Sequence, residues 1–377
     1  MPELLFLLLP VAAAYGWFMG RNSLKTKELK GRADVTRNLS SGLNFLLTDQ
    51  EDKAIEQLLE LLDIEAATID TYLALANLFR RKGDWDKAIK IHEKLHQLKL
   101  PKNKAQQIQF ELAKDYFSAG LFDRAEYLLL PLTDNELLRE AVLKQLFSIF
   151  LATHEPQKAV ALQPAVEKTQ SRSLRIMLAN MQIQHLEKSQ QLDLNRLQQL
   201  AEYFPQAIRP RVALARQALA EQQPAVAKEA ILSVLKQRVQ WAAELLPLLQ
   251  QCQLDATEWQ QLLSPLADKH NISACLLLTD HLAEHQSAAA AEQYLLPKLR
   301  QQPNIRLFQK LLQLRQQQSA LAAEALISVE ELVNAYLDSK ALYSCRSCGF
   351  KTRQPYWLCP SCQQWETVEP IAGIDGR

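Results

Sequence analysis

The chain has few glycines, and its long central part has none. Nine glycines occur among 377 residues, and none lies between Leu121 and Cys348. Tight β-hairpin turns depend on glycine, so a long stretch without it that is rich in Leu, Ala, Gln and Glu favours helices over hairpins. We therefore expect an all-α protein. The glycine positions also exclude a GxGxxG dinucleotide-binding loop, a Walker A loop and a nucleophile elbow.

The chain also lacks an excess of charge of either sign. Lys and Arg number 43 and Asp and Glu number 42, which gives a formal net charge of +1 at pH 7. Such a balance offers no broad positive field that would attract polyanions. Nucleic acid is therefore not expected as a partner.

Catalytic motifs are scarce as well. The string HLAEH, from His281 to His285, matches the HxxEH signature of inverted zinc proteases. No further ligand motif accompanies it, and the two histidines occupy a packing position and a turn position of the repeat pattern described below. A structural role explains both residues, so we expect that the protein is not an enzyme.

One uncharged apolar run opens the chain. Residues 4–20 read LLFLLLPVAAAYGWFMG, which as a helix is roughly 25 Å long and close to one bilayer hydrocarbon core. Five basic residues follow the run between positions 21 and 32 and none precedes it, so the positive-inside rule places the rest of the chain in the cytoplasm. A cleaved signal peptide is the alternative, but it would need a basic segment before the run. We expect a single-pass anchor at residues 1–20 and a basic juxtamembrane linker at residues 21–37.

A pattern of small, aromatic, turn and small positions recurs after the linker. Its closing alanines are separated by 34, 37 and 34 residues. Four units carry it: Gly42, Phe45, Asp49, Ala54; Ala76, Phe79, Gly83, Ala88; Ala113, Tyr116, Gly120, Ala125; and Phe147, Phe150, His154, Ala159. Weaker copies place Gln222 and His285 at the turn.

This period and this order of residues resemble the tetratricopeptide repeat. We expect a solenoid over residues 38–336, with roughly eight helical hairpins stacked into a superhelix that has a concave face. Such scaffolds bind other proteins. The alternative is a generic helical bundle whose periodicity is accidental.

Four of the six cysteines crowd into the C-terminal tail. Cys345, Cys348, Cys359 and Cys362 form two CxxC motifs separated by ten residues. Two facing CxxC turns supply four thiolates at tetrahedral reach, and Gly349 allows a left-handed backbone after the first turn. Zinc or a single iron suits four thiolates, whereas free thiols or a redox disulfide pair are the alternative. We expect a metal-binding domain at residues 340–377, and we expect the remaining cysteines, Cys252 and Cys275, to be buried as small hydrophobic residues.

The motif YxCxxCGF followed by the motif YWxCPxC resembles the two knuckles of rubredoxin, with a much shorter insertion between them. That resemblance implies iron, while the chemistry of four thiolates allows zinc equally. Coordination by four cysteines leaves no open position, so the metal is expected to be structural rather than hydrolytic.

The apolar opening, the repeats and the ending CRSCGF…YWLCPSCQQW…PIAGIDG together resemble the lipopolysaccharide assembly protein B family of Gram-negative bacteria. The resemblance implies an inner-membrane protein with most of its chain in the cytoplasm. It also implies a regulator that, with a membrane AAA+ protease, promotes degradation of the deacetylase that commits precursors to lipid A, and that contacts other lipopolysaccharide-assembly membrane proteins. The metal module is implied to pack against the repeats, with Cys345, Cys348, Cys359 and Cys362 as rubredoxin-type ligands.

Two other functions stay open at this point. A rubredoxin-like electron carrier on a repeat scaffold would need an exposed sulfur edge and reversible reduction. A general chaperone or secretion scaffold would need no protease. A homodimer is compatible with the regulator, the electron carrier and the general scaffold alike, but no residue pattern supports it.

Overall fold

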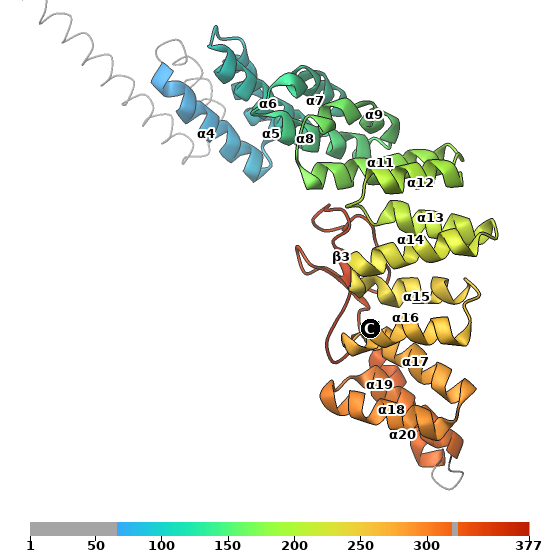
Figure 1. Ribbon diagram of the computed structural model, residues 1–377. Coiled ribbons are helices and arrows are strands. Elements are labelled where there is room, and N and C mark those ends of the chain that lie inside the picture. The colour runs from blue at the N-terminus through green and yellow to red at the C-terminus, as the bar shows by residue number, and fades with distance from the viewer. Residues whose placement is uncertain (1–65, 319–322, 377) are drawn as a thin grey trace, which may run out of the picture. The chain divides into compact units, whose positions relative to one another are not determined.

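The structure, a computed structural model, describes residues 66–318 and 323–376 (Figure 1). The predicted anchor at residues 1–20, the linker at 21–37 and the predicted repeat unit around Phe45 lie outside this part of the chain. None of the helices that the structure describes is long and apolar enough to cross a membrane. The described residues fall into two compact units, one ending at Ile149 and one beginning at Phe150.

The first unit consists of antiparallel helix pairs joined by short turns. Its elements are α4 (Ala66–Lys82), α5 (Trp85–His96), α6 (Lys102–Ser118), α7 (Phe122–Leu129), the 3₁₀ helix η2 (Leu130–Asp134) and the start of α8 (Arg139–Ala152). Successive helices pack on each other, and the small and aromatic positions of the repeat pattern, Ala76, Phe79 and Ala88, are buried in the core. The small residues allow close approach of two helices and the aromatic ring fills the space between them, as the pattern predicts.

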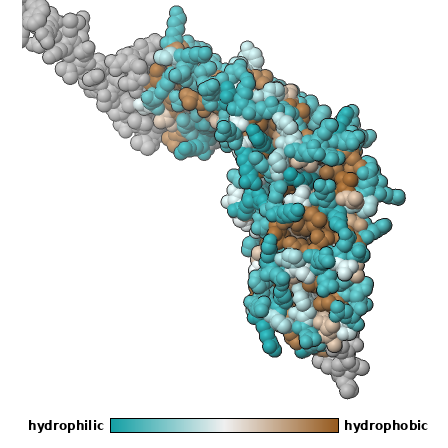
Figure 2. Space-filling view, viewed as in Figure 1, coloured by the Kyte–Doolittle hydropathy of each residue, from teal (hydrophilic) through white to brown (hydrophobic). Residues whose placement is uncertain are grey.

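The second unit continues the stack of helices. Its helical elements are α9 (Pro156–Ala161), α10 (Gln163–Glu167), α11 (Arg172–Lys188), α12 (Leu194–Tyr203), α13 (Arg209–Ala220), α14 (Pro224–Gln237), the 3₁₀ helix η3 (Val239–Trp241), α15 (Ala242–Gln250), α16 (Ala256–Asp268), α17 (Ile272–His285), α18 (Ala288–Gln301), α19 (Ile305–Gln318) and α20 (Ala323–Ser339). One continuous core of Leu, Ile, Val and Ala side chains runs from α11 to α19. Cys252 and Cys275 are buried in it, as predicted. Polar side chains cover most of the face seen in Figure 2, and apolar side chains gather in smaller areas.

Four of the predicted turn positions adopt the left-handed backbone, whereas His285 is the last residue of α17 and does not have a positive φ. Gly83 and Gly120 have φ angles of 89° and 76°, and His154 and Gln222, which stand where a glycine is usual, have φ angles of 57° and 58°. The amide of the residue after each turn closes the end of the preceding helix, as in the bond from Gln223 N to Ala218 O at 2.8 Å. The repeat register therefore holds where glycine has been replaced.

The histidines of the HxxEH string lie on α17, with ring centroids 4.3 Å apart. His281 is half-buried and His285 is exposed at the last residue of the helix. Burial and the neighbouring His285 lower the pKa of His281. Within the described residues, a group of three or more side chains able to hold a metal occurs only at the four C-terminal cysteines.

The C-terminal tail adds a short β-sheet to the helices expected from the sequence, within the region where the cysteines predicted a small rubredoxin-like domain. After α20 the chain forms three short strands, β1 (Tyr343–Cys345), β2 (Lys351–Thr352) and β3 (Val368–Pro370), in an antiparallel sheet of order β2-β1-β3. We call residues 343–370 the ribbon. Its strands pair because the first CxxC turn folds the chain back on β1, and the residues after the second turn return along the other edge of β1. Helical periodicity in the rest of the chain gives no indication of such short strands.

Candidate metal centre and its attachment to the repeats

Two turns of matching shape present the four cysteines. The amide of Gly349 donates to Cys345 O at 2.8 Å, and the amide of Gln363 donates to Cys359 O at 2.9 Å. Both residues have a left-handed backbone, with φ angles of 75° at Gly349 and 53° at Gln363. The first turn has the glycine that the sequence predicts for this conformation, whereas the second turn adopts it with glutamine.

The sulfur atoms of Cys345, Cys348, Cys359 and Cys362 converge on one point. All four lie within 4.8 Å of one another, and the Sγ–Sγ distance is 3.7 Å both between Cys345 and Cys362 and between Cys348 and Cys359. A disulfide would require about 2.05 Å. A tetrahedral ion with metal–sulfur bonds of about 2.3 Å separates its ligands by roughly 3.8 Å. The arrangement therefore fits a four-thiolate ion, and it suits zinc and iron alike.

The surroundings lower the pKa of two of these thiols and raise the pKa of a third. Burial alone would raise the pKa of Cys345, but a hydrogen bond with Thr367 Oγ1 at 3.3 Å and nearby backbone amides outweigh it and lower the pKa to about 6. The amide of Phe350 contributes most to lowering the pKa of Cys348. Burial and the other three sulfurs raise the pKa of Cys362 to about 12. A bound cation is what would let all four sulfurs stay ionised together.

The ribbon is attached to the repeats by a buried carboxylate, that of Glu366. Glu366 is 1% exposed. Its carboxylate accepts from the backbone amides of Ile208, at 2.9 and 3.0 Å, and Arg209, at 3.1 Å, at the start of α13, and from Asn180 Nδ2 on α11 at 3.2 Å. An acidic group at a helix N-terminus satisfies free amides and interacts favourably with the helix dipole. Burial nevertheless raises the pKa of Glu366, although these donors and Arg238 oppose the shift.

Aromatic and ionic contacts extend this attachment over neighbouring helices. The indole rings of Trp357 and Trp241 stack at a centroid distance of 4.9 Å and an angle of 7°. Glu369 of β3 pairs with Arg238 at the end of α14, with 2.5 Å between Oε1 and Nη1. The hydroxyl of Tyr343 donates to Glu244 on α15. The ribbon and the repeats of the second unit therefore share one packed interface.

The last residues of the chain continue the contact to α19. Asn304, which is buried just before α19, donates from Nδ2 to the carbonyl oxygens of Gly373 at 2.9 Å and Gly376 at 3.2 Å. The amide of Ile305 donates to Ile374 O at 2.9 Å. The tail thus satisfies the start of α19 in the way that Glu366 satisfies the start of α13.

The sequence predicted the cluster of four cysteines, and the family resemblance implied that the metal module packs against the repeats, but the residues that make this attachment were not predicted. The CxxC spacing announces the thiolate cluster because its ligands are close in sequence. Glu366, Asn180 and Ile208 are far apart along the chain, and two of their contacts involve backbone amides that carry no residue-type signal. The only sequence signal for this attachment was an acidic residue, Glu366, between Trp365 and Thr367.

Comparison with family models agrees with the two structural parts. Residues 71–105 match the model of the tetratricopeptide repeat, and residues 343–370 match that of the rubredoxin metal binding domain. The fold and the thiolate cluster thus define a helical-repeat protein that carries a rubredoxin-type ribbon on its repeats.

Full-length relatives narrow this class further. The chain is 35% identical to lipopolysaccharide assembly protein B of Escherichia coli (strain K12) over an alignment of 389 positions that covers 100% of both chains. It is 31% identical to lipopolysaccharide assembly protein B of Haemophilus influenzae, with 99% of each chain covered. The chain therefore belongs to the lipopolysaccharide assembly protein B family.

Solved structures add little to this assignment. The structure of Naa15/Naa10 bound to HypK-THB matches 79% of this chain and 58% of that chain at 14% identity and a TM-score of 0.41. A structure of Pseudomonas aeruginosa pilF matches 55% of this chain and 92% of that chain at 17% identity and a TM-score of 0.32. Similarity this low carries no functional argument.

Proposed function

We propose that this protein is a membrane-anchored cytoplasmic scaffold that regulates lipopolysaccharide synthesis. In this role it brings the deacetylase that commits precursors to lipid A to a membrane AAA+ protease, and so promotes degradation of the deacetylase. The observation that carries the proposal is the full-length similarity to relatives named for lipopolysaccharide assembly. A stack of helical repeats suits this role because its continuous surface binds proteins.

The anchor gives the scaffold its location. Residues 1–20 would hold the repeats at the cytoplasmic face of the inner membrane, beside a protease in the same bilayer. Tethering both proteins to one surface raises the effective concentration of the client at the protease, without any new contact. Tight binding of the client is then unnecessary.

We further propose that Cys345, Cys348, Cys359 and Cys362 are the ligands of one structural metal ion. The ion would supply a tetrahedral crosslink between the two CxxC turns. The chain's own residues do the rest: Gly349 and Gln363 set the two turns, and Glu366 holds the ribbon on α13. The metal thereby supports the scaffold instead of taking part in a reaction.

Deleting residues 1–20 tests the scaffold role. The truncated protein should fold, because the described core lies beyond the deleted residues, but it should no longer promote turnover of the deacetylase. The measurement is the half-life of the deacetylase in cells that make either form at the abundance of the native protein. A truncated chain with a heterologous membrane anchor is the control and should restore turnover. Normal turnover with the unanchored chain would show that tethering is irrelevant.

An electron carrier is the second candidate, and the exposure of Cys348 favours it. A sulfur ligand that meets solvent is the route by which such a site would exchange electrons with a partner. The test is reversible reduction of the iron-loaded protein, followed by deacetylase turnover with the zinc-loaded protein. Turnover that requires iron would support the carrier, and equal turnover with both metals would support the scaffold.

A further inference from the structure

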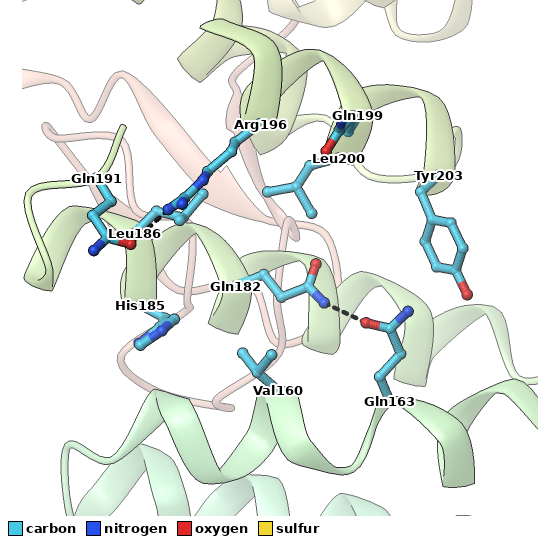
Figure 3. Close-up of a pocket in the computed structure, with 10 residues that line it drawn as sticks. All are labelled: Val160, Gln163, Gln182, His185, Leu186, Gln191, Arg196, Gln199, Leu200 and Tyr203. Carbon is cyan, nitrogen blue, oxygen red and sulfur yellow. Dashed lines mark hydrogen bonds between the residues drawn. The ribbon is translucent and has the colours of Figure 1, made fainter. Parts of the chain in front are cut away.

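The second unit contains a pocket that neither the metal centre nor the ribbon explains. It has a volume of about 430 Å³ and lies between α9–α10, α11 and α12. That volume falls within the range of about 300–1,000 Å³ typical of ligand sites. Figure 3 shows its side chains converging from these helices on a common space.

One buried side chain in this pocket has an unused hydrogen-bonding atom. Gln182 on α11 is 7% exposed. Its Nε2 donates to Gln163 Oε1 at 2.9 Å, but its own Oε1 has no hydrogen-bond partner. In Figure 3 this oxygen points into the pocket, toward Leu200. A buried carboxamide oxygen without a partner is unfavourable unless a ligand supplies a donor.

Amide side chains are frequent among the other residues that line the pocket. Arg196 is the one permanently charged side chain among the lining residues, and it is already paired with Asp193 at 3.3 Å and with Gln191 Oε1 at 2.5 Å. A phosphate or other anion would therefore find no free positive charge. The hydroxyl of Tyr203 already donates to Glu167, so its proton is not available to a ligand.

The lining instead matches the chemistry of a peptide group. A carboxamide has the donor and acceptor pair of a backbone amide, so Gln182 and Gln163 can bond to main chain whatever its sequence. Val160, Leu186 and Leu200 supply apolar contacts for an intervening side chain. Extended polypeptides offer this alternation of amides and side chains.

We propose that this pocket binds an extended segment of a client polypeptide, with a main-chain N–H of the segment donating to Gln182 Oε1. The proposal deepens the scaffold function and rests on it, because the segment would belong to the deacetylase. The pocket would hold one short stretch of the client while the repeats contact the rest.

The test uses the full-length protein in detergent and short, overlapping, fluorescently labelled peptides that tile the deacetylase sequence. Binding is measured by fluorescence anisotropy for the wild type, Gln182→Leu and Gln198→Leu. Gln182→Leu keeps the approximate side-chain size and removes the acceptor together with the donor to Gln163, whereas Gln198→Leu makes the same change on α12 outside the lining. A photo-crosslinking residue in place of Gln199, which is exposed at the pocket, locates the bound peptide.

We expect at least one peptide to bind the wild type and Gln198→Leu, to crosslink at position 199, and to bind Gln182→Leu about tenfold more weakly, as expected for loss of one buried hydrogen bond. Gln182→Leu also loses the donor to Gln163 Oε1, so a thermal melt accompanies the binding measurement and should show a folded protein whose melting temperature is modestly lower than that of the wild type. Equal binding by Gln182→Leu overturns the proposal. Binding of the intact deacetylase without binding of any peptide overturns the pocket but not the scaffold, whereas failure of both overturns both.

Discussion

At the scale of single residues, the carboxylate of Glu366 takes the place of water at the start of α13. It accepts from two backbone amides and from Asn180 in a site that solvent hardly reaches. Removing such an acceptor strands several buried donors at once, and each stranded donor carries its own desolvation cost. Glu366 is therefore worth more to stability than an exposed ion pair of similar geometry.

Glu366→Ala should lower the free energy of unfolding of the second unit by about 3 kcal/mol, since it leaves the amides of Ile208 and Arg209 unpaired. Chemical denaturation followed by the stacked tryptophans of the ribbon interface measures the change. Glu258→Ala, which removes an exposed partner of Lys228 at 3.0 Å, is the matched control and should cost at most about 0.5 kcal/mol. Similar losses for both variants would contradict the role given to Glu366.

The raised pKa of Glu366 predicts a pH dependence of known sign. The folded protein holds this proton more tightly than the unfolded chain, whose carboxyl has the ordinary value of 4.5. Its contribution to stability is therefore complete below pH 4.5 and is lost as the pH rises through the raised folded value. Glu366→Gln cannot titrate, so the melting temperature of the wild type relative to this variant should fall as the pH rises above 4.5. If the melting temperature of the wild type instead rose relative to Glu366→Gln as the pH rises, the hydrogen-bond donors, rather than burial, would determine the direction of the pKa shift of Glu366.

At the scale of elements, the turns between helices show how far sequence reasoning reaches. Gly83 and Gly120 indicated the positions of their turns in the sequence, because glycine adopts positive φ without strain. The later turns use Gln190, Gln222, Gln253 and His270 in the same backbone region. Glutamine and histidine do not favour positive φ, so only the repeat register indicated the turn at Gln222, and the repeat boundaries become harder to predict along the chain.

Restoring glycine at one of these turns should stabilise the protein. Gln222→Gly relieves a left-handed residue with a side chain, and we expect a gain of about 0.5–1 kcal/mol. Gln217→Gly, in the interior of α13, is the control and should instead cost about 1 kcal/mol. Thermal unfolding of the two variants side by side decides the point, and a loss at both positions would mean that the side chain of Gln222 contributes contacts of its own.

The ribbon shows the opposite balance of what could be predicted. Local spacing was enough to predict that the sulfur atoms of Cys345, Cys348, Cys359 and Cys362 come together, because the two CxxC turns are nearly self-contained. The strands were missed because they are two or three residues long and owe their pairing to those turns. The docking contacts were missed because they join residues separated by more than 100 positions in sequence, such as Asn180 and Glu366.

At the scale of the molecule, the ribbon and tail fasten together helices that are distant in the stack. Glu366 reaches α13, Tyr343 reaches α15 and the last glycines reach Asn304 before α19. A local crosslink in the ribbon should therefore influence a large part of the second unit. The repeats alone, stacked neighbour on neighbour, would transmit stability only step by step.

Removing the metal should accordingly loosen more than the ribbon. Chelation, or Cys345→Ser, is expected to release the metal, lower the melting temperature and speed hydrogen exchange at the starts of α13 and α19. Helices α4–α6 of the other compact unit serve as the internal reference, and Cys252→Ala is the control for loss of a cysteine outside the cluster. Exchange that changes in residues 343–370 alone would show that the ribbon is an independent appendage.

Glu366 lies 157 positions after Arg209 in the sequence, and this separation sets an order of events during synthesis. A ribosome completes α11 and α13 well before it reaches the glutamate that satisfies Asn180, Ile208 and Arg209. Until then these groups rely on water, and the surface that the ribbon will cover stays open to chaperones and proteases. A chain that stops before Glu366 would leave these donors without their acceptor and the surface under the ribbon exposed.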